Sequence, residues 1–260
     1  MKKMIFTIAG LLAAASVFAQ ADKVIKVGAT PKPHAELLNL VKADLTKQGY
    51  TLEVKEFTDY VQPNVAVQNG ELDANFFQHT PYMDNFNKER KFTLVNAGGI
   101  HIEPMGGYSR KIKNLKDLKE NSWVAIPNDP TNEGRALLLL QEAKLIKLKP
   151  GIGLTATPRD MIENKAKLNF KELEAAQLPR AVSDVDLAII NGNYAINAGF
   201  KKKDAILIEG ASSPYVNIVA VKKGSETQPK IIALVKALQS KAVKDYINKT
   251  YADGSVIAVF

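Results

Sequence analysis

Residues 73–82 read Asp73-Ala-Asn-Phe-Phe-Gln-His-Thr-Pro-Tyr82, and the interpretation of the whole chain starts from them. The order of residues predicts the end of a strand followed at once by a helix with Thr80 as its N-cap. In α/β proteins, ligands bind beside the carboxyl ends of the strands. Phe76 and Phe77 could be ordinary core residues, and His79 a buried polar group with its hydrogen bonds satisfied. So many side chains that stack and form hydrogen bonds, gathered in one short stretch, nevertheless favour a binding site.

Strands and helices alternate on both sides of this stretch. The apolar spacing predicts strands and helices in turn over residues 24–28, 34–48, 51–57, 63–69, 73–79 and 80–91. This rhythm indicates an α/β fold with mainly parallel sheets flanked by helices. A glycine pair at Gly106-Gly107 marks a break, after which further strands are expected at 123–126, 168–173, 186–190, 205–208 and 216–221, and helices at 135–143 and 230–249. We therefore expect two lobes, the first from residues 22–107 and 222–260 and the second from 108–221.

The N-terminal residues 1–21 have the pattern of a secretory signal peptide. Lys2 and Lys3 precede an uncharged apolar run over residues 4–18, and small residues follow at Ala19 and Ala21. The run is too short for a membrane span. We expect an exported, periplasmic protein, and cleavage would reduce the net charge from +8 to +6, because two lysines and no acid are removed.

Composition narrows the classes of function. The lysines are spread among acidic residues with no basic run between aromatics, so we expect no nucleic-acid partner. The chain contains no cysteine, which excludes disulfides, thiolate metal sites and a catalytic thiol. For the same reason we expect no lipid anchor on an N-terminal cysteine. We expect a freely diffusing protein and a monomer.

A second candidate site lies at residues 128–135, Asn128-Asp-Pro-Thr-Asn-Glu-Gly-Arg135, after one strand and at the start of a helix. Asp129 or Thr131 can cap this helix, whose N-terminal N–H groups would attract an anion. Arg135 could grip a carboxylate with two hydrogen bonds. A plain capped helix with a solvated arginine is the alternative.

Asparagines at the ends of two further strands, Asn191 and Asn217, offer both a donor and an acceptor, which suits a zwitterion. Turn formation explains such asparagines equally well. Signs of an enzyme are poor, because the chain has no G-x-S-x-G motif and its G-x-G-x-x-A match at residues 151–156 does not follow a strand. The histidines at 34, 79 and 101 lack a recognisable metal-ligand spacing.

Taken together, the motifs resemble those of the methionine-binding substrate-binding proteins of ABC importers, the NlpA/MetQ lipoprotein family. The segments that carry the resemblance span nearly all of the chain after residue 21: residues 59–64, 73–82, 128–132 with Gly134-Arg135, 178–180 and 213–217.

The resemblance implies a two-lobed periplasmic-binding-protein fold of type II that closes on a small amino acid or dipeptide. It also implies no catalysis, no cofactor, and the permease and ATPase complex of an inner-membrane importer as partner. The implied ligand-binding residues come from both lobes: Tyr60, Phe77, His79 and Tyr82 around the ligand side chain, Asn132 and Arg135 at its backbone with Arg135 on the carboxylate, and Asn191 and Asn217 at the amino-acid group.

The expected function is the capture of L- or D-methionine for import. Three alternatives remain open. The ligand could be another apolar amino acid or a methionyl dipeptide. The protein could instead be a periplasmic hydrolase that uses His79 with a nearby carboxylate, or a receptor that binds a metal through its histidines.

Overall fold

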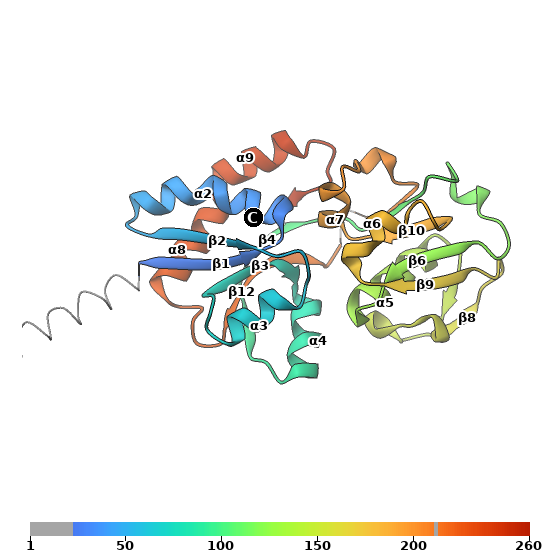
Figure 1. Cartoon of the computed structure of the whole chain (residues 1–260), viewed down its shortest axis with the longest axis horizontal. Coiled ribbons are helices and arrows are strands. Elements are labelled where there is room, and N and C mark those ends of the chain that lie inside the picture. Colours follow the sequence, from blue (N-terminus) through green and yellow to red (C-terminus); the bar gives the residue numbers. More distant parts are fainter. Residues whose placement is uncertain (1–22, 211–212) are drawn as a thin grey trace, which may run out of the picture.

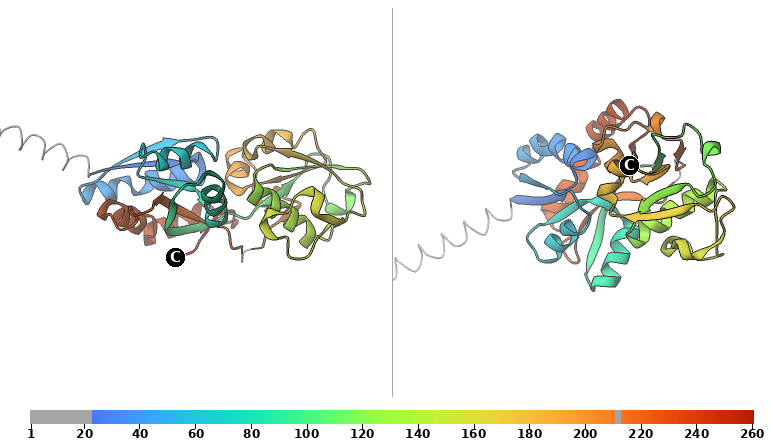
Figure 2. Two further views of the ribbon diagram at one scale, coloured as in Figure 1. Left: turned by 90° about the horizontal axis from the view of Figure 1, so that it is seen from below. Right: turned by 45° about the vertical axis from the view of Figure 1, so that its right-hand side comes forward.

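The structure, a computed structural model, describes residues 23–210 and 213–260, so the expected signal peptide lies outside it. Two sheets lie side by side along the long axis, each with its own helices (Figure 1). Viewed from below, the two halves meet along a narrow waist (Figure 2). The expected two-lobed α/β architecture is confirmed.

The first sheet has six strands in the order β13-β4-β12-β3-β1-β2. Their bounds are β1 Val24–Ala29, β2 Thr51–Glu56, β3 Ala74–His79, β4 Leu94–Ile102, β12 Val216–Lys222 and β13 Ile257–Ala258. β1 pairs in parallel with β2 and β3, whereas β12 and β13 pair antiparallel with their neighbours. The parallel strands that we expected thus form one half of this sheet.

Helices cover both faces of the first sheet (Figure 1). They are α2 Glu36–Lys47, α3 Gln62–Gln68, α4 Thr80–Arg90, α8 Pro229–Leu238 and α9 Lys241–Thr250, with the short helical segment η1 Pro31–Ala35 before α2. Apolar residues of α2, α8 and α9 form one core cluster with the sheet. Those of α3 and α4 contribute to another cluster on the opposite face. Helices therefore pack on both faces of the sheet, while Thr51, Glu53 and Lys55 of the edge strand β2 remain exposed.

The second sheet has five strands in the order β11-β5-β10-β6-β9. Its strands are β5 Gly106–Tyr108, β6 Trp123–Pro127, β9 Asn169–Leu173, β10 Leu187–Ile190 and β11 Leu207–Ile208, and its helices are α5 Pro130–Glu142, α6 Leu178–Ala181 and α7 Gly192–Asn197. A small hairpin, β7 Lys147–Leu148 with β8 Met161–Glu163, and the 3-10 turns η2 Leu115–Asp117, η3 Gly153–Thr155, η4 Pro158–Asp160, η5 Ala175–Gln177 and η6 Lys202–Asp204 complete this lobe.

Gly134 allows the η3 turn to pack directly on α5. A Cβ atom at residue 134 would lie 2.2 Å from the carbonyl oxygen of Leu154. Real Cβ atoms do not approach a backbone atom so closely, so a larger residue would push η3 away. The glycine next to Arg135 therefore fixes the first turns of α5 against their own lobe.

The chain passes between the sheets twice, through residues 103–105 and through the segment between β11 and β12. The strand pairing differs slightly from the expected lobe boundaries. Residues 216–221, expected in the second lobe, pair with β3 and β4 of the first sheet. Gly106 and Gly107 pair with β10 of the second sheet. The reason is that both crossings occur just before a strand begins.

The expected C-terminal helix over residues 230–249 is two helices. α8 ends at Leu238, and Ser240 caps α9 by accepting a hydrogen bond from the Val243 N–H at 3.4 Å. Apolar spacing continues across the break, so periodicity alone did not reveal it.

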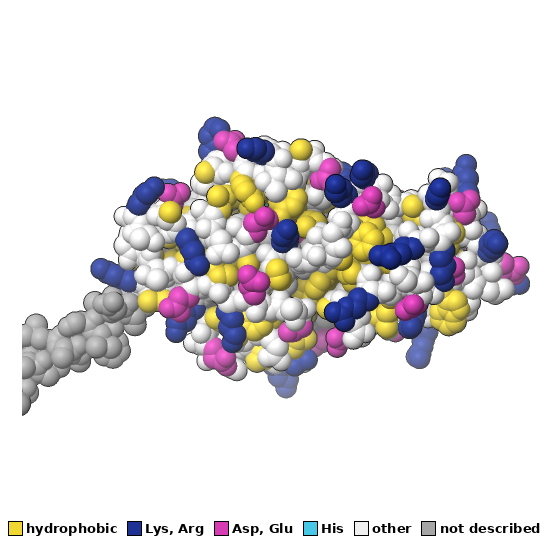
Figure 3. All heavy atoms as spheres, turned by 45° about the horizontal axis from the view of Figure 1, so that its top comes forward, with side chains coloured by type: hydrophobic (Ala, Val, Ile, Leu, Met, Phe, Trp, Pro, Cys, Tyr) yellow, Lys and Arg dark blue, Asp and Glu magenta, His cyan; other side chains and the backbone are white. Residues whose placement is uncertain are grey.

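No helix among the described residues is long and apolar enough to cross a membrane. On the face shown in Figure 3, basic and acidic side chains alternate over both lobes and form no single basic patch.

Candidate functional site

A cavity lies between the lobes, and all eight residues expected at the site line it. The space without protein atoms there is about 320 Å³. Its lining consists of Tyr60, Phe77, Gln78, His79, Tyr82, Glu103, Asn132, Arg135, Asn191, Gly192, Asn193 and Asn217. The first sheet and its loops supply one wall, and the starts of α5 and α7 supply the other. The convergence follows from the fold, because strand ends of both sheets face the same waist.

One wall is aromatic. The ring centroids of Tyr60, Phe77 and Tyr82 lie between 5.6 and 6.0 Å from one another. Tyr194 of the second lobe stacks on Tyr60 with the centroids 4.9 Å apart. Burial raises the pKa of Tyr60 and Tyr82, so both hydroxyls stay neutral. This wall offers a neutral, polarizable surface to an apolar side chain.

His79 ends β3 and is held at both ring nitrogens. Its Nδ1 accepts a hydrogen bond from the Tyr82 N–H at 3.2 Å, so His79 caps α4 and the expectation that Thr80 is the cap was wrong. Its Nε2 then carries the proton and donates to Asn132 Oδ1 at 3.2 Å. Burial, with help from the Arg135 charge, lowers the pKa of His79 to about 3. The ring is therefore a neutral donor that connects the two lobes.

Asn132 is fixed by its neighbours at the start of α5. Asp129 accepts from the Asn132 N–H at 3.0 Å and from its side-chain amide at 2.9 and 3.0 Å, which confirms Asp129 as the cap of this helix. The Asn132 oxygen also accepts from the Asn191 amide at 2.8 Å. The side-chain oxygen of Asn191, Oδ1, is buried and has no hydrogen-bond partner among residues 23–210 and 213–260. An unpaired acceptor in the wall of a cavity suits an N–H group of a ligand.

Arg135 is already paired with an acid that the sequence did not indicate. Its Nε and Nη2 donate to the two oxygens of Glu209 at 3.0 and 2.5 Å, and Nη2 also donates to the Glu103 carbonyl at 3.0 Å. The guanidinium lies 4.0 Å from the centre of the Tyr215 ring. No hydrogen bond joins Nη1 to any of the described residues. Arg135 therefore has one edge left for a ligand, and its charge is partly neutralised.

A buried amide network supports the floor of the cavity. Gln78 donates to Asn64 at 2.7 Å and to Asn75 at 2.8 Å, and Asn75 donates to Asn64 at 2.8 Å. Asn64 returns a hydrogen bond to Gln78 at 3.0 Å. Gln78 lies within residues 73–82 but was not among the expected site residues. The alternation of side chains along β3 indicates which of them share a face of the sheet. It does not indicate that the amides of Asn75 and Gln78, three residues apart, form a hydrogen bond with each other next to the cavity.

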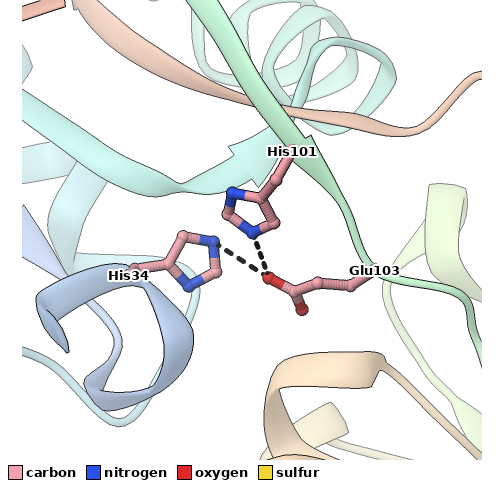
Figure 4. Close-up of side chains that lie close together, drawn as sticks. All are labelled: His34, His101 and Glu103. Atoms are coloured by element: carbon pink, nitrogen blue, oxygen red, sulfur yellow. Dashed lines mark hydrogen bonds and ion pairs between the residues drawn. The ribbon is translucent and has the colours of Figure 1, made fainter. Parts of the chain in front are cut away.

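Glu103 was also missed, although it stands directly after β4 and two residues from His101. It joins His34 and His101 in a buried cluster (Figure 4): Oε1 lies 2.6 Å from His101 Nε2 and 3.3 Å from His34 Nε2. His34 Nδ1 is 2.8 Å from the Thr30 hydroxyl. Asn191 was selected because it directly follows a strand, and the same criterion would have selected Glu103, which directly follows β4.

This cluster brings together two of the three histidines that we had considered for a metal, whereas His79 lies with Asn132 and Tyr82. Three ligand atoms within 4.8 Å of one another could hold a divalent ion. Both His34 and His101 direct Nε2 at the same carboxylate oxygen (Figure 4), and His34 Nε2 also lies 3.2 Å from Asn217 Oδ1, so an ion would have to displace the hydrogen bond between His101 and Glu103.

Two α/β lobes with an enclosed site at their waist define a two-lobed substrate-binding protein. The model of the NlpA lipoprotein family matches residues 25–260, so the chain belongs to that family. It is 45% identical over 225 residues to the D-methionine-binding lipoprotein MetQ of Escherichia coli strain K12, covering 85% of this chain and 82% of the relative. It is 41% identical over 236 residues to the membrane lipoprotein TpN32 of Treponema pallidum, covering 90% and 88%.

Among solved structures, a nutrient-binding protein of Burkholderia cenocepacia bound to methionine superposes with a TM-score of 0.88 at 49% identity, covering 91% of this chain and all of that one. The family resemblance inferred from the motifs is thus confirmed. The relatives are named lipoproteins, which conflicts with our expectation of an unanchored protein, although the chain contains no cysteine.

Proposed function

We propose that this chain is a periplasmic substrate-binding protein that captures methionine and delivers it, as a monomer, to an ABC importer. The observation that carries the proposal is the cavity at the waist, which combines an aromatic wall from one lobe with polar groups from both. Its chemistry matches a small zwitterion with an apolar side chain. The methionine-bound relative supports the same ligand.

The thioether would lie against the rings of Tyr60, Phe77 and Tyr82. Sulfur is polarizable and gains about 0.3–1.5 kcal/mol from each good aromatic contact. The charged end would lie where the lobes meet, with Arg135 Nη1 of the second lobe on the carboxylate and the side-chain amide of Asn217, on β12 of the first sheet, beside it. Asn217 Oδ1 is 3.2 Å from His34 Nε2, which leaves the amide N–H groups of Asn217 to face the cavity.

Hydrogen bonds across the waist explain how ligand capture and closure are coupled. The Tyr60 hydroxyl donates to Asn193 at 2.6 Å, and the Tyr194 hydroxyl donates to the Thr58 carbonyl at 2.9 Å. A ligand in the cavity can contact both lobes only when these contacts form. It therefore stabilises the closed state, which is the state that an importer would recognise.

The hydrolase alternative receives little support from the geometry of His79. Both ring nitrogens are used, one as the cap of α4 and one as a donor to Asn132, so no lone pair remains to accept a proton from water. The chemistry of the cavity wall is that of a receptor.

Thermal unfolding with candidate ligands tests the proposal. We expect L- or D-methionine at a hundred times its dissociation constant to stabilise the protein by about 2.7 kcal/mol, and other apolar amino acids and methionyl dipeptides to do so only at higher concentration. Zn²⁺ tests the metal alternative through the His34 cluster. A large shift with Zn²⁺ and none with methionine would overturn the proposal.

A matched pair of variants locates the effect. Asn217→Ala should abolish the methionine shift, whereas Asn85→Ala, half-buried on α4 and outside the cavity lining, should leave it unchanged. Retention of full methionine affinity in Asn217→Ala would contradict the assignment of the ligand to this cavity.

A further inference from the structure

A second hollow adjoins the ligand cavity across its aromatic wall, and we call it the vestibule. The space without protein atoms there is about 780 Å³, part of it open to solvent. Tyr60 and Tyr82 line both spaces, and Tyr194, which stacks on Tyr60, lines only the vestibule. The other lining residues of the vestibule come from both lobes: Asp59, Val61, Gln62, Asn128, Asp129, Glu174, Ala175 and Ala176. A ligand group held against the tyrosines in the cavity therefore has the vestibule on the other side of the rings.

Three carboxylates, those of Asp59, Asp129 and Glu174, make the vestibule negative. Of the described residues that line it, none is a lysine or an arginine. Arg135, the cation in the wall of the neighbouring cavity, is already paired with Glu209. This excess of acid is unexpected in a chain whose formal net charge is +8. A cleft lined by charges of one sign focuses its potential on whatever enters it.

Two of these carboxylates also hold the starts of helices, which does not remove their charge. Asp59 Oδ1 accepts from the N–H groups of Val61 and Gln62 at 2.7 and 2.8 Å. Asp129 accepts from the N–H group and the side-chain amide of Asn132. Burial raises the pKa of Asp129, whereas these hydrogen bonds favour its ionised form. A helix N-terminus carries only about half a positive charge, so the vestibule stays negative.

The negative potential extends to the tyrosines of the aromatic wall. Burial raises the pKa of Tyr82, and the charges of Asp129 and Asp59 raise it further. The pKa of Tyr194 is raised by burial and by the same two acids together with Glu174. Methionine is a neutral zwitterion, so its uncharged side chain gains nothing from this potential. A cation in the place of the thioether would lie within it and against aromatic faces, which attract cations.

The wall suits a cation that needs no hydrogen bonds. The Tyr60 hydroxyl donates to Asn193 at 2.6 Å, and the Tyr82 hydroxyl donates to the Tyr60 carbonyl at 3.0 Å. The three carboxylates line the vestibule and not the cavity. A primary ammonium has three donors and is strongly hydrated, so it would lose hydrogen bonds at this wall. A sulfonium has no donor, and its methyl groups present the positive charge to the rings.

We propose that this site captures, besides methionine, the sulfonium derivatives of methionine, of which S-methylmethionine is the smallest. The inference rests on the proposed function and adds a class of ligand: an amino acid with the methionine skeleton and a fixed positive charge at sulfur. The amino-acid end would bind as it does in methionine. The carboxylates of the vestibule supply the counter-charge from the other side of the aromatic wall.

A pair of ligands with the same shape isolates the charge at sulfur. In 2-amino-5-methylhexanoate a neutral CH group replaces the sulfonium of S-methylmethionine. Titration calorimetry on the wild-type protein should show that S-methylmethionine binds at least about tenfold more tightly than this isostere, equivalent to about 1.4 kcal/mol. L-Lysine, whose side-chain cation is an ammonium, should bind at least about tenfold more weakly than S-methylmethionine.

A double variant, Asp59→Asn with Glu174→Gln, removes two of the three vestibule charges. An asparagine at position 59 keeps the single oxygen that accepts both hydrogen bonds, and Glu174 is exposed, so the fold should persist. We expect the preference for S-methylmethionine over the isostere to fall to within about threefold. The control Glu142→Gln removes an exposed acid of α5 that lines neither space, and it should keep the full preference.

Each outcome decides a separate point. Equal binding of S-methylmethionine and its isostere by the wild-type protein would overturn the inference, while methionine binding in the same experiment would leave the proposed function standing. An unchanged preference in the double variant, or an equal loss in Glu142→Gln, would also overturn it, because the vestibule would then not supply the counter-charge.

Should the double variant fail to fold, Glu174→Gln alone decides the same point, with an expected loss of about twofold in the preference and an unchanged preference as the contrary result. Lysine binding as tight as that of S-methylmethionine would refute the assignment of a sulfonium. Failure of the wild-type protein to bind methionine would refute the proposed function itself.

Discussion

The ion pair between Arg135 and Glu209 leads to an unusual expectation: removing the charge of Glu209 should weaken the fold and strengthen ligand binding. Arg135 is 4% exposed and Glu209 is 12% exposed, and two hydrogen bonds join them. Glu209→Gln keeps an oxygen that can accept one of these hydrogen bonds but leaves the guanidinium without a full counter-charge.

The size of each effect follows from the geometry. Breaking a buried ion pair by removing one partner costs about 3–5 kcal/mol, and because an acceptor remains we expect about 2–4 kcal/mol here. For a protein of this size that lowers the melting temperature by roughly 5–15 °C. A ligand carboxylate on the other edge of the Arg135 guanidinium would lie roughly 6 Å from Glu209. At an effective dielectric constant between about 20 and 80, their repulsion is about 1–3 kcal/mol.

Thermal unfolding and titration calorimetry on the same preparations measure both effects. In Glu209→Gln the melting temperature without ligand should fall while the methionine dissociation constant decreases about 5- to 100-fold. Glu142→Gln, an exposed acid at the end of α5, serves as the control and should change neither quantity. Weaker methionine binding in Glu209→Gln would refute the reasoning, because it would mean that Arg135 does not meet the ligand carboxylate.

Three further predictions concern stability and processing. Burial and the nearby acids Glu172 and Asp129 raise the pKa of Glu133 in the folded protein to about 7, above its unfolded value, so ionising this carboxylate lowers the stability of the fold as pH rises from about 4.5 to 7. Glu133→Gln should therefore raise the melting temperature clearly at pH 8 and hardly at pH 4. Equal gains in melting temperature at both pH values would contradict this. Asn64→Ala leaves the amides of Gln78 and Asn75 short of partners, and chemical unfolding should show a loss of about 2–4 kcal/mol; a loss below about 1 kcal/mol would show that the network contributes little. Mass spectrometry of the exported protein should show cleavage after residue 19 or 21, and a mature chain that begins elsewhere would contradict the expected signal peptide.

The sequence pointed to this cavity because polar and aromatic side chains at strand ends converge in an α/β fold, and the family resemblance selected the eight expected residues that line it. Phe77 and His79 end one strand and Asn191 follows another, and two sheets that face one waist bring such ends together. The family resemblance then assigned a wall to each. This reasoning depends on local position and topology, which a sequence reports well.

Partners that are far apart in the chain could not be predicted in the same way. Glu209 meets Arg135 across 74 residues, and nothing near either residue indicates the other. His34 and Glu103 meet only because η1 and the first crossing lie against each other. The cap of α4 shows a different limit: Thr80 is the commoner cap by residue type, but the imidazole of His79 reaches the Tyr82 N–H first.

The central claim is that one cavity, shared by both lobes, binds methionine, and titration calorimetry with one substitution in each lobe tests it most directly. The wild-type protein should bind one methionine per chain, and both Phe77→Ala in the first lobe and Asn132→Ala in the second should weaken binding by at least about tenfold while remaining folded. Absence of methionine binding, or full affinity in either folded variant, would contradict the claim.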